Sequence, residues 1–412
     1  MSDLLAGVRV LEAAVLFNGD HLGMLLADLG ADVIKVESPQ RGDYLRDMLG
    51  QITPHHSPAH VQVNRNKRSL TLDLRTEPGR EVFKDLLLTA DVFVDGFRAG
   101  ACERLGVGYA AQRQVKPDIV YCHCSGFGGR GPYASIPTHG QMMNALAAAT
   151  PVRMDADGLV RRVVSDDLMG GTTGGGDGTA AAGVHAALHV VAALVRRAHT
   201  GLGCHLDAAG ADAVIANGWI GAIYGLNEHR ITDRHDLRPQ DQAPHSGAKY
   251  QWYQTADERF VLFCCIEHRF WQRFCSVVGR PDLAGHADPR GPVDFGYGDE
   301  PLRRELQAIF SGRTQREWVR LAAAERLPIG PSNVGVQSLR DDPHLRARGV
   351  LVEGDHPEAG EFTYVAPPVI VDGQSFAIGR PAPELGQHTD ELLAELGYPP
   401  ERIQALRAAG VV

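Results

Sequence analysis

The chain has few of the features that point to nucleic acid, to a membrane or to secretion. Its 41 Lys and Arg residues are outnumbered by 50 Asp and Glu residues, and the net charge of -9 argues against nucleic acid as the main partner. The most membrane-like run, Thr179 to Val195, contains two histidines and is just short of a span, so it predicts a buried helix. The opening residues carry Arg9 and Glu12 inside their apolar run, which does not fit a signal peptide.

Cysteine is also scarce. Seven cysteines, an odd number in a chain of 412 residues, favour reduced thiols and a cytoplasmic location. Cys122 and Cys124 lie on a predicted strand, where alternate residues share one face and both thiols can pack inward. A zinc site needs more ligands at closer spacing, so we expect no metal.

The length and the order of apolar segments predict an α/β protein with two domains. A chain of 412 residues is long for one core. Residues 8–11, 22–29 and 33–37 follow the strand, helix, strand order of a βαβ unit, which implies a parallel sheet. Residues 206–216 have a helical pattern, residues 225–250 form a polar linker, and a hairpin followed by two amphipathic helices predicts a smaller α+β domain.

Two turns resemble a dinucleotide site without matching it. Glu37 ends a predicted strand, where an acid can bind a ribose hydroxyl, but residues 16–20 lack the glycine fingerprint that holds a pyrophosphate. Residues 126–131 contain G-x-G-x-x-G after a strand, yet Pro132 stands where a helix should begin. We therefore expect a flexible site loop there.

The segment from Gly170 to Cys204 is the strongest candidate for chemistry. A glycine-rich loop leads into a long alanine-rich helix, and Asp177 stands at the junction. The positive end of a helix favours the ionised carboxylate that a nucleophile or base needs, although Asp177 can also be a simple helix cap. His139, in a loop beside the glycine-rich segments, is a candidate base or an ordinary surface histidine.

Basic residues suggest an anionic ligand. Lys67, Arg68, Arg98 and Arg104 follow or flank predicted strands and can together meet several phosphates of a nucleotide. The alternative for each of them is a solvated surface position.

These stretches together resemble the class III CoA-transferase family, which includes formyl-CoA, carnitine and bile-acid CoA-transferases and α-methylacyl-CoA racemase. The matching segments run nearly from end to end, in order: residues 7–11, 26–37, 66–69, 91–98, 126–133, 200–203 and 381–389.

The resemblance implies a Rossmann-like large domain built from both chain ends, a small domain and an interlocked homodimer. The corresponding ranges are 1–224 and 336–412 for the large domain and 225–335 for the small one. It also implies coenzyme A contacts, which fall on six positions: Lys67, Arg68, Phe97, Arg98, Arg104 and Leu105.

The resemblance further implies an aspartate that attacks an acyl-CoA thioester, passes through a mixed anhydride and an enzyme–CoA thioester, and delivers CoA to a carboxylic acid. Asp177 lies 24 residues before Gly201, close to the family spacing, and Asp167 lies 34 before it in a similar local context. We favour Asp177 and keep Asp167 as the alternative. Acyl-CoA is then a substrate, and no cofactor is bound permanently.

Two other functions remain open from the sequence. The racemase branch has a histidine at the position of His139, acting with the aspartate as an acid/base pair, so proton abstraction is the first alternative. A CoA-binding protein without catalysis is the second, because the glycine-rich loop departs from the family pattern.

Overall fold

The computed structural model describes residues 2–162, 176–235, 237, 247–287 and 291–412. The described residues divide into two compact units. Unit 1 comprises 2–162, 176–223 and 344–412, and unit 2 comprises the described part of 224–343. Each unit has a hydrophobic core of its own.

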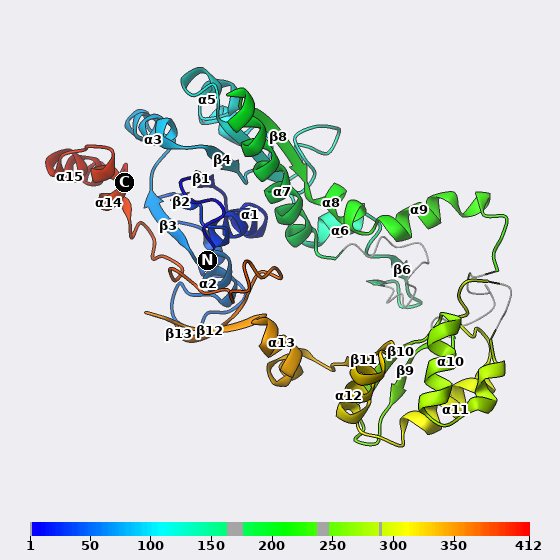
Figure 1. Cartoon of the computed structure of the whole chain (residues 1–412). Helices are drawn as coiled ribbons and strands as arrows, with labels where there is room; N and C mark the ends of the chain where they lie inside the picture. Colours follow the sequence, from blue (N-terminus) through cyan, green and yellow to red (C-terminus); the bar gives the residue numbers. More distant parts are fainter. Residues whose placement is uncertain (1, 163–175, 236, 238–246, 288–290) are drawn as a thin grey trace. The chain divides into compact units, whose positions relative to one another are not determined.

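Unit 1 is built on a six-stranded sheet whose strand order is β3-β2-β1-β4-β5-β8, with every neighbouring pair parallel (Figure 1). The strands are β1 Arg9–Ala13, β2 Asp32–Glu37, β3 Lys67–Thr71, β4 Val92–Asp95, β5 Val120–Ser125 and β8 Cys204–Ala209. The mixed α/β class and the large parallel sheet expected from the βαβ pattern are confirmed.

Helices cover both faces of this sheet, and most side chains on both faces of its strands are buried. On one face, α1 (Phe17–Asp28) and α7 (Gly178–Thr200) pack over a core that includes Val10, Val94 and Cys122. On the other face, α3 (Glu77–Thr89), α14 (Thr389–Glu395) and α15 (Pro400–Ala408) pack over Phe93 and Tyr121.

The long helix α7 begins at Asp177, as its sequence predicts. The Asp177 carboxylate caps its first turn, and Gly201, with a φ of 70°, ends it in the left-handed conformation. Glycine at 183 lets α1 approach closely, since a Cβ there would lie 2.5 Å from His21 Nδ1. Among the described helices, α7 is the one long and apolar enough to cross a membrane by length and composition, a test that core helices of soluble proteins also pass.

The C-terminal segment completes unit 1. The His388 amide donates to the Ser69 carbonyl at 3.0 Å, and the Thr71 amide donates to Thr389 Oγ1 at 3.1 Å. Val411 and Val412 are buried in the core over α3. Residues more than 300 positions apart in the sequence thus share one core.

One secondary-structure expectation is wrong. Residues 206–216 have a helical pattern, but their first part belongs to strand β8, and only α8 (Gly210–Asn217) is helical. Alternate residues of β8 are more and less buried, and β8 pairs with β5 over its whole length, so tertiary pairing overrides the preference of alanine for helix. Asp157 and Gly158 form the turn of a hairpin between β6 (Val152–Met154) and β7 (Val160–Arg162), since an Asp-Gly pair is well suited to such a turn.

The other helices and strands of unit 1 are short and connect or flank the sheet. They are α2 Pro58–Val63, α4 Ala101–Arg104, α5 Tyr109–Val115, α6 Gln141–Leu146, α9 Trp219–Asn227 (whose last turn belongs to unit 2), α13 Pro343–Arg348, β12 Leu351–His356 and β13 Gly360–Val365.

Unit 2 is an antiparallel three-stranded sheet covered by helices, as the hairpin and amphipathic segments predict. Its elements are β9 Tyr250–Gln254, β10 Phe260–Cys264, β11 Ile329–Ser332, α10 His268–Val277, α11 Glu300–Phe310 and α12 Gln315–Glu325. Its core is aromatic: Phe274, Phe310 and Trp318 are each buried, and the rings of Phe310 and Trp318 lie 4.7 Å apart.

Candidate active site

The strand order indicates a ligand site at the carboxyl ends of β1 and β4. The order reverses between these two strands, and ligands of open α/β sheets bind outside the carboxyl ends at such a point. Glycine is required at both following turns, because a Cβ on Gly19 or Gly96 would lie 2.3 or 2.5 Å from the Ala14 Cβ. No side chain therefore stands at these two positions, where a ligand would approach the backbone.

Phe97, Arg98, Arg104 and Leu105 follow β4 and lie next to this reversal. Phe97 and Leu105 are half-buried against the core, whereas Arg98 and Arg104 are exposed. Neither guanidinium forms an ion pair with any residue in the described part of the chain. Two uncommitted cations beside two apolar side chains suit a ligand with phosphates and a flat apolar ring.

Lys67 has a different place from the one expected of a phosphate ligand. Its side chain is fully buried, its ammonium lies 2.7 Å from Glu12 Oε2, and it donates to the Asp20 carbonyl and to Asn64 Oδ1 at 2.9 Å each. A lysine committed in this way has no free surface for a ligand. Lys67 instead stabilises the fold through its buried contacts with Glu12, Asp20 and Asn64.

Arg68 is also committed to protein partners. Only 6% of its side chain is exposed, and it pairs with Asp32, Glu391 and Glu395. These contacts fasten α14 to the edge of the sheet. The structure thus separates the basic residues foreseen for one anion site into two buried ones and two exposed ones.

A second buried lysine lies in the same interior. Lys35 Nζ contacts carboxylates of Glu12 at 3.1 Å and Asp43 at 3.0 Å and is also paired with Asp20. Burial alone would lower the pKa of Lys35, but the three carboxylates more than offset this and raise it. Burial is the largest cause of the raised pKa of Asp20, and the negative charge of Asp43 is the next.

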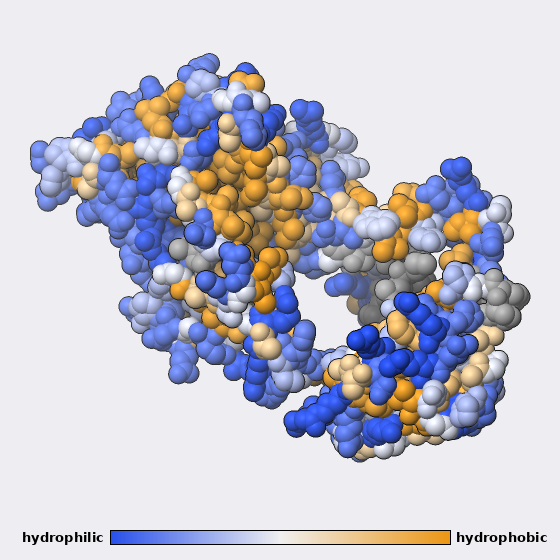
Figure 2. Space-filling model, viewed as in Figure 1, coloured by the Kyte–Doolittle hydropathy of each residue, from blue (hydrophilic) through white to orange (hydrophobic). Residues whose placement is uncertain are grey.

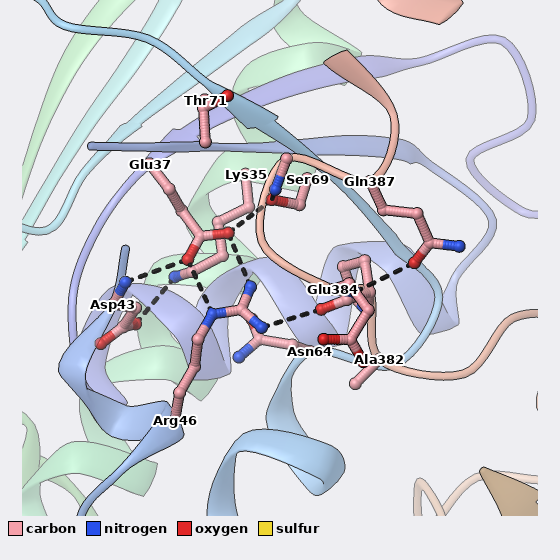
Figure 3. A network of polar contacts seen from close by, with 12 residues as sticks. Lys35, Glu37, Asp43, Arg46, Asn64, Ser69, Thr71, Ala382, Glu384 and Gln387 are labelled. Carbon is pink, nitrogen blue, oxygen red and sulfur yellow. Dashed lines mark hydrogen bonds and ion pairs between the residues drawn. The ribbon is translucent and has the colours of Figure 1, made fainter. Parts of the chain in front are cut away.

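Glu37 belongs to an adjoining network and not to a ribose site (Figure 3). Its carboxylate accepts from Arg46 Nη2 at 2.8 Å, from Ser69 Oγ at 2.6 Å and from the Asp43 amide at 3.0 Å. Arg46 in turn donates to the Pro383 carbonyl at 3.0 Å. With every lone pair direction used, Glu37 holds β2, β3 and the C-terminal segment together.

Asp177 is exposed at the first turn of α7. One carboxylate oxygen accepts from the amides of Thr179 at 2.8 Å and Ala180 at 3.3 Å and from the Thr179 hydroxyl. Both amides bond to Oδ1, so Oδ2 is directed elsewhere. The alternative carboxylate, Asp167, lies outside the described residues.

His139 is exposed in the loop before α6. Its carbonyl accepts from the Met142 amide at 3.0 Å. Asn144, in α6, holds both sides of Asp177: its amide group donates to the Gly176 carbonyl at 2.6 Å, and its Oδ1 accepts from the Gly178 amide at 3.0 Å. α6 is therefore tied to the loop that carries Asp177.

Asn144 was not foreseen from the sequence, because a single asparagine in a short helix carries no pattern. Asp207 was also missed. It accepts from the Gly129 amide at 2.7 Å, but it stands in the segment whose strand the sequence concealed. Recognition of β8 would have placed Asp207 at the carboxyl end of a strand, the usual position of site residues.

Comparison with known proteins identifies the family of the chain. The model of CoA-transferase family III matches residues 5–389. The chain is 30% identical to a formyl-CoA:oxalate CoA-transferase of Rhodopseudomonas palustris over 439 residues, covering 100% of this chain and 97% of the relative. It is 30% identical over 421 residues to a succinyl-CoA--L-malate CoA-transferase beta subunit of Chloroflexus aurantiacus, covering 99% and 98%.

A solved structure is similar as well. A CAIB/BAIF family protein from Brucella suis superposes with a TM-score of 0.70 at 26% identity, covering 96% of this chain and 100% of that one. A family match across most of the chain, relatives of the same length and a shared fold lead to one conclusion. The chain belongs to CoA-transferase family III.

Proposed function

We propose that this enzyme moves CoA from an acyl-CoA donor to a small carboxylic acid with Asp177 as the nucleophile. The observation that carries the proposal is an exposed carboxylate at the positive end of α7 whose Oδ1 takes both amide hydrogen bonds. That arrangement occupies Oδ1 and leaves Oδ2 to attack. The names of the relatives, which join formyl-CoA with oxalate and succinyl-CoA with L-malate, support this substrate class.

The chemistry is a sequence of four acyl exchanges. An Asp177 oxygen attacks the thioester carbonyl, the C–S bond breaks, and a mixed anhydride and CoA thiolate form. The thiolate attacks the aspartyl carbonyl and releases the donor acid, which leaves an aspartyl–CoA thioester. The acceptor carboxylate displaces CoA to give a second anhydride, whose acceptor carbonyl the thiolate then attacks. Acceptor-CoA leaves, and the aspartate is regenerated.

A direct assay tests the proposal. Purified protein is incubated with formyl-CoA and oxalate, and separately with succinyl-CoA and L-malate, and the acyl-CoA products are separated by chromatography. Transfer with either pair, without net hydrolysis, is the expected result. An enzyme that binds acyl-CoA but forms no new thioester with these or other carboxylic acids would contradict it.

Proton abstraction is the second candidate, and one observation favours it. Asn144 ties α6 to the residues on both sides of Asp177, and the exposed His139 lies in the loop that leads into α6. A histidine and an aspartate on opposite sides of an acyl-CoA α-carbon would exchange its proton, as a racemase requires.

The proposed CoA site consists of Phe97, Arg98, Arg104 and Leu105. Arg98→Gln and Arg104→Gln should each raise the KM for acyl-CoA about 10-fold with little change in kcat, because a lost phosphate contact weakens ground state and transition state alike. The wild-type KM should also rise with salt concentration. Steady-state kinetics at two ionic strengths measures both effects.

Arg113→Gln is the matched control, since Arg113 is an exposed arginine of nearby α5. It should keep the wild-type KM. An equal KM in all three variants would show that Arg98 and Arg104 are ordinary surface residues.

We further propose a homodimer with a large domain of residues 1–224 and 336–412 and a small domain of 225–335. An apolar area extends over α7 (Figure 2), where Val184 and Leu188 are 51% and 63% exposed. Trp219 and Ile220 of α9 are 56% and 47% exposed. Exposed apolar side chains such as these on α7 and α9 are typical of a permanent subunit interface.

Sedimentation at micromolar concentration should therefore give twice the mass of 44.5 kDa. Ile220→Asp should shift the protein toward the monomer, because a carboxylate would be buried without a partner. Leu88→Asp, at a 54% exposed leucine of α3, should leave the dimer intact. A wild-type protein that sediments as a monomer would refute the dimer.

A further inference from the structure

We propose that Asp95, His123 and Asp207 form a row of positioning residues that holds two backbone loops around the CoA site. The inference rests on the proposed function for the identity of the ligand. The three residues come from β4, β5 and β8, which are neighbours in the sheet.

The register of the sheet creates the row. Asp95 pairs with His123, and His123 pairs with Asp207, at the carboxyl ends of three parallel strands. Residues paired in register project from the same face. Asp95 and His123 are only 2% and 5% exposed, and they continue a face that is otherwise apolar, with Phe93 and Tyr121 immediately before them. Buried polar groups in such a place need partners.

Two members of the row hold the peptide groups of Phe97. The Phe97 amide donates to Asp95 Oδ1 at 3.0 Å. His123 Nε2 lies 2.9 Å from the Phe97 carbonyl, and because a carbonyl can only accept, this nitrogen carries the proton. Asp95 is itself fixed by the Tyr121 hydroxyl at 2.7 Å. Both backbone polar groups of Phe97 are thus set by buried side chains, and Arg98 follows directly.

The third member holds the glycine loop that follows β5. Asp207 Oδ1 accepts from the Gly129 amide at 2.7 Å and lies 3.5 Å from His123 Nδ1. A Cβ on Gly129 would lie 3.3 Å from both His123 Nδ1 and Asp207 Oδ2. The loop therefore rests directly on the pair, and glycine at 129 permits that approach.

His123 is the centre of the arrangement, since it bonds to the Phe97 loop through one ring nitrogen and faces Asp207 and Gly129 with the other. Asp95 and Asp207 each anchor one of the two loops, and His123 lies between them in the sheet. Because buried side chains hold the peptide groups of Phe97, the backbone that carries Phe97 and Arg98 is fixed before the ligand arrives. Such preorganisation lowers the entropic cost of binding.

The test compares two substitutions at His123 in the full-length protein, with free CoA as the probe in titration calorimetry. His123→Leu removes both nitrogens at similar size and should weaken CoA binding about 10-fold, the effect of losing one ordering hydrogen bond. His123→Gln can keep an N–H donor toward Phe97 and should stay within about 3-fold of wild type. With formyl-CoA or succinyl-CoA as donor, His123→Leu should raise KM more than it lowers kcat.

Tyr398→Phe is the control for general destabilisation. It removes the hydrogen bond that the Tyr398 hydroxyl donates to the Asp85 carboxylate at 2.6 Å, in another part of the same core. It should leave CoA affinity unchanged even where its unfolding midpoint falls as far as that of His123→Leu. Equal loss of affinity in Tyr398→Phe and His123→Leu, or wild-type affinity in His123→Leu, would overturn the positioning role.

The proposed function fails in a different way. If wild-type protein binds CoA and forms no new thioester, the transferase proposal is wrong, while the comparison of His123→Leu with His123→Gln still decides the role of the row. If Arg98→Gln weakens CoA binding and His123→Leu does not, the site is correct and the row is not needed to position it.

Discussion

Asp177→Asn will lower kcat for CoA transfer by at least about 1,000-fold, because an amide cannot form the anhydride on which the proposed reaction depends. The substitution should leave the cap of α7 intact. Asn is as good a helix cap as Asp, and its Oδ1 can accept from the amides of Thr179 and Ala180 as the carboxylate does. The unfolding midpoint should therefore stay close to that of the wild type. Single-turnover transfer and thermal unfolding measure the two quantities.

Hydroxylamine identifies the acylated residue directly. Wild-type protein treated with acyl-CoA and hydroxylamine should be inactivated, with a mass change on the peptide that contains Asp177. Asp167→Asn is the matched comparison and should retain most activity. A label on the Asp167 peptide, with full activity in Asp177→Asn, would transfer the nucleophile to Asp167.

A third outcome would favour the racemase. Rapid solvent deuterium uptake at the α-carbon, lost in His139→Ala, with no labelled aspartate, would replace the anhydride mechanism by proton abstraction. For a transferase, His139→Ala should keep most activity, since no proton transfer limits anhydride formation.

Lys35→Met will lower the free energy of unfolding by about 3–5 kcal/mol, the usual cost of removing one partner from a buried ion network. Lys35 is fully buried and neutralises Glu12, Asp20 and Asp43, so its loss leaves three carboxylates with Lys67 as the remaining nearby lysine. Chemical denaturation at pH 7 measures the effect. Because this network is buried in the core, the substitution should affect the stability of the protein more than its specificity for a substrate.

The stability that Lys35→Met loses relative to the wild type should become smaller as the pH falls from 7 toward 5. Burial raises the pKa of Asp43, but the charge of Lys35 and a hydrogen bond from Asp20 outweigh burial, so the pKa of Asp43 in the folded protein is lowered. The wild type therefore gains stability above the pKa of an unfolded aspartate, which is near 4. That gain is lost only as pH falls through the lowered pKa. Without Lys35 the carboxyls take up protons at higher pH, which relieves their repulsion and stabilises the variant relative to the wild type.

Arg75→Met provides the comparison. Arg75 pairs with Asp73 at 2.8 Å, but 61% of its side chain is exposed and water screens the pair. Its stability should match the wild type at both pH values. A Lys35→Met protein as stable as Arg75→Met would mean that the buried carboxyls are neutral in the native state.

Much of the fold follows from local pattern. Apolar strands followed by amphipathic helices predict a parallel α/β sheet, because each segment must bury one face or both. The Asp177 cap, the end of α7 at Gly201 and the hairpin at Gly158 are local as well, since each depends on the conformations open to one or two residues. The family is recognisable from the sequence because its motifs lie on the strands of the large sheet and in the turns beside them.

The sequence by itself determined the class of fold, the family and the position of Asp177 at a helix start. Only the tertiary structure decided which charged residues face a ligand. Lys67 and Arg98 both flank strands and look alike in the sequence, yet Lys67 is enclosed by Glu12 and Asn64 while Arg98 is exposed. The row from Asp95 to Asp207 was hidden likewise, because its members come from three separate strands and meet only through strand register. Burial and register are set by partners distant in the chain, and no local pattern records them.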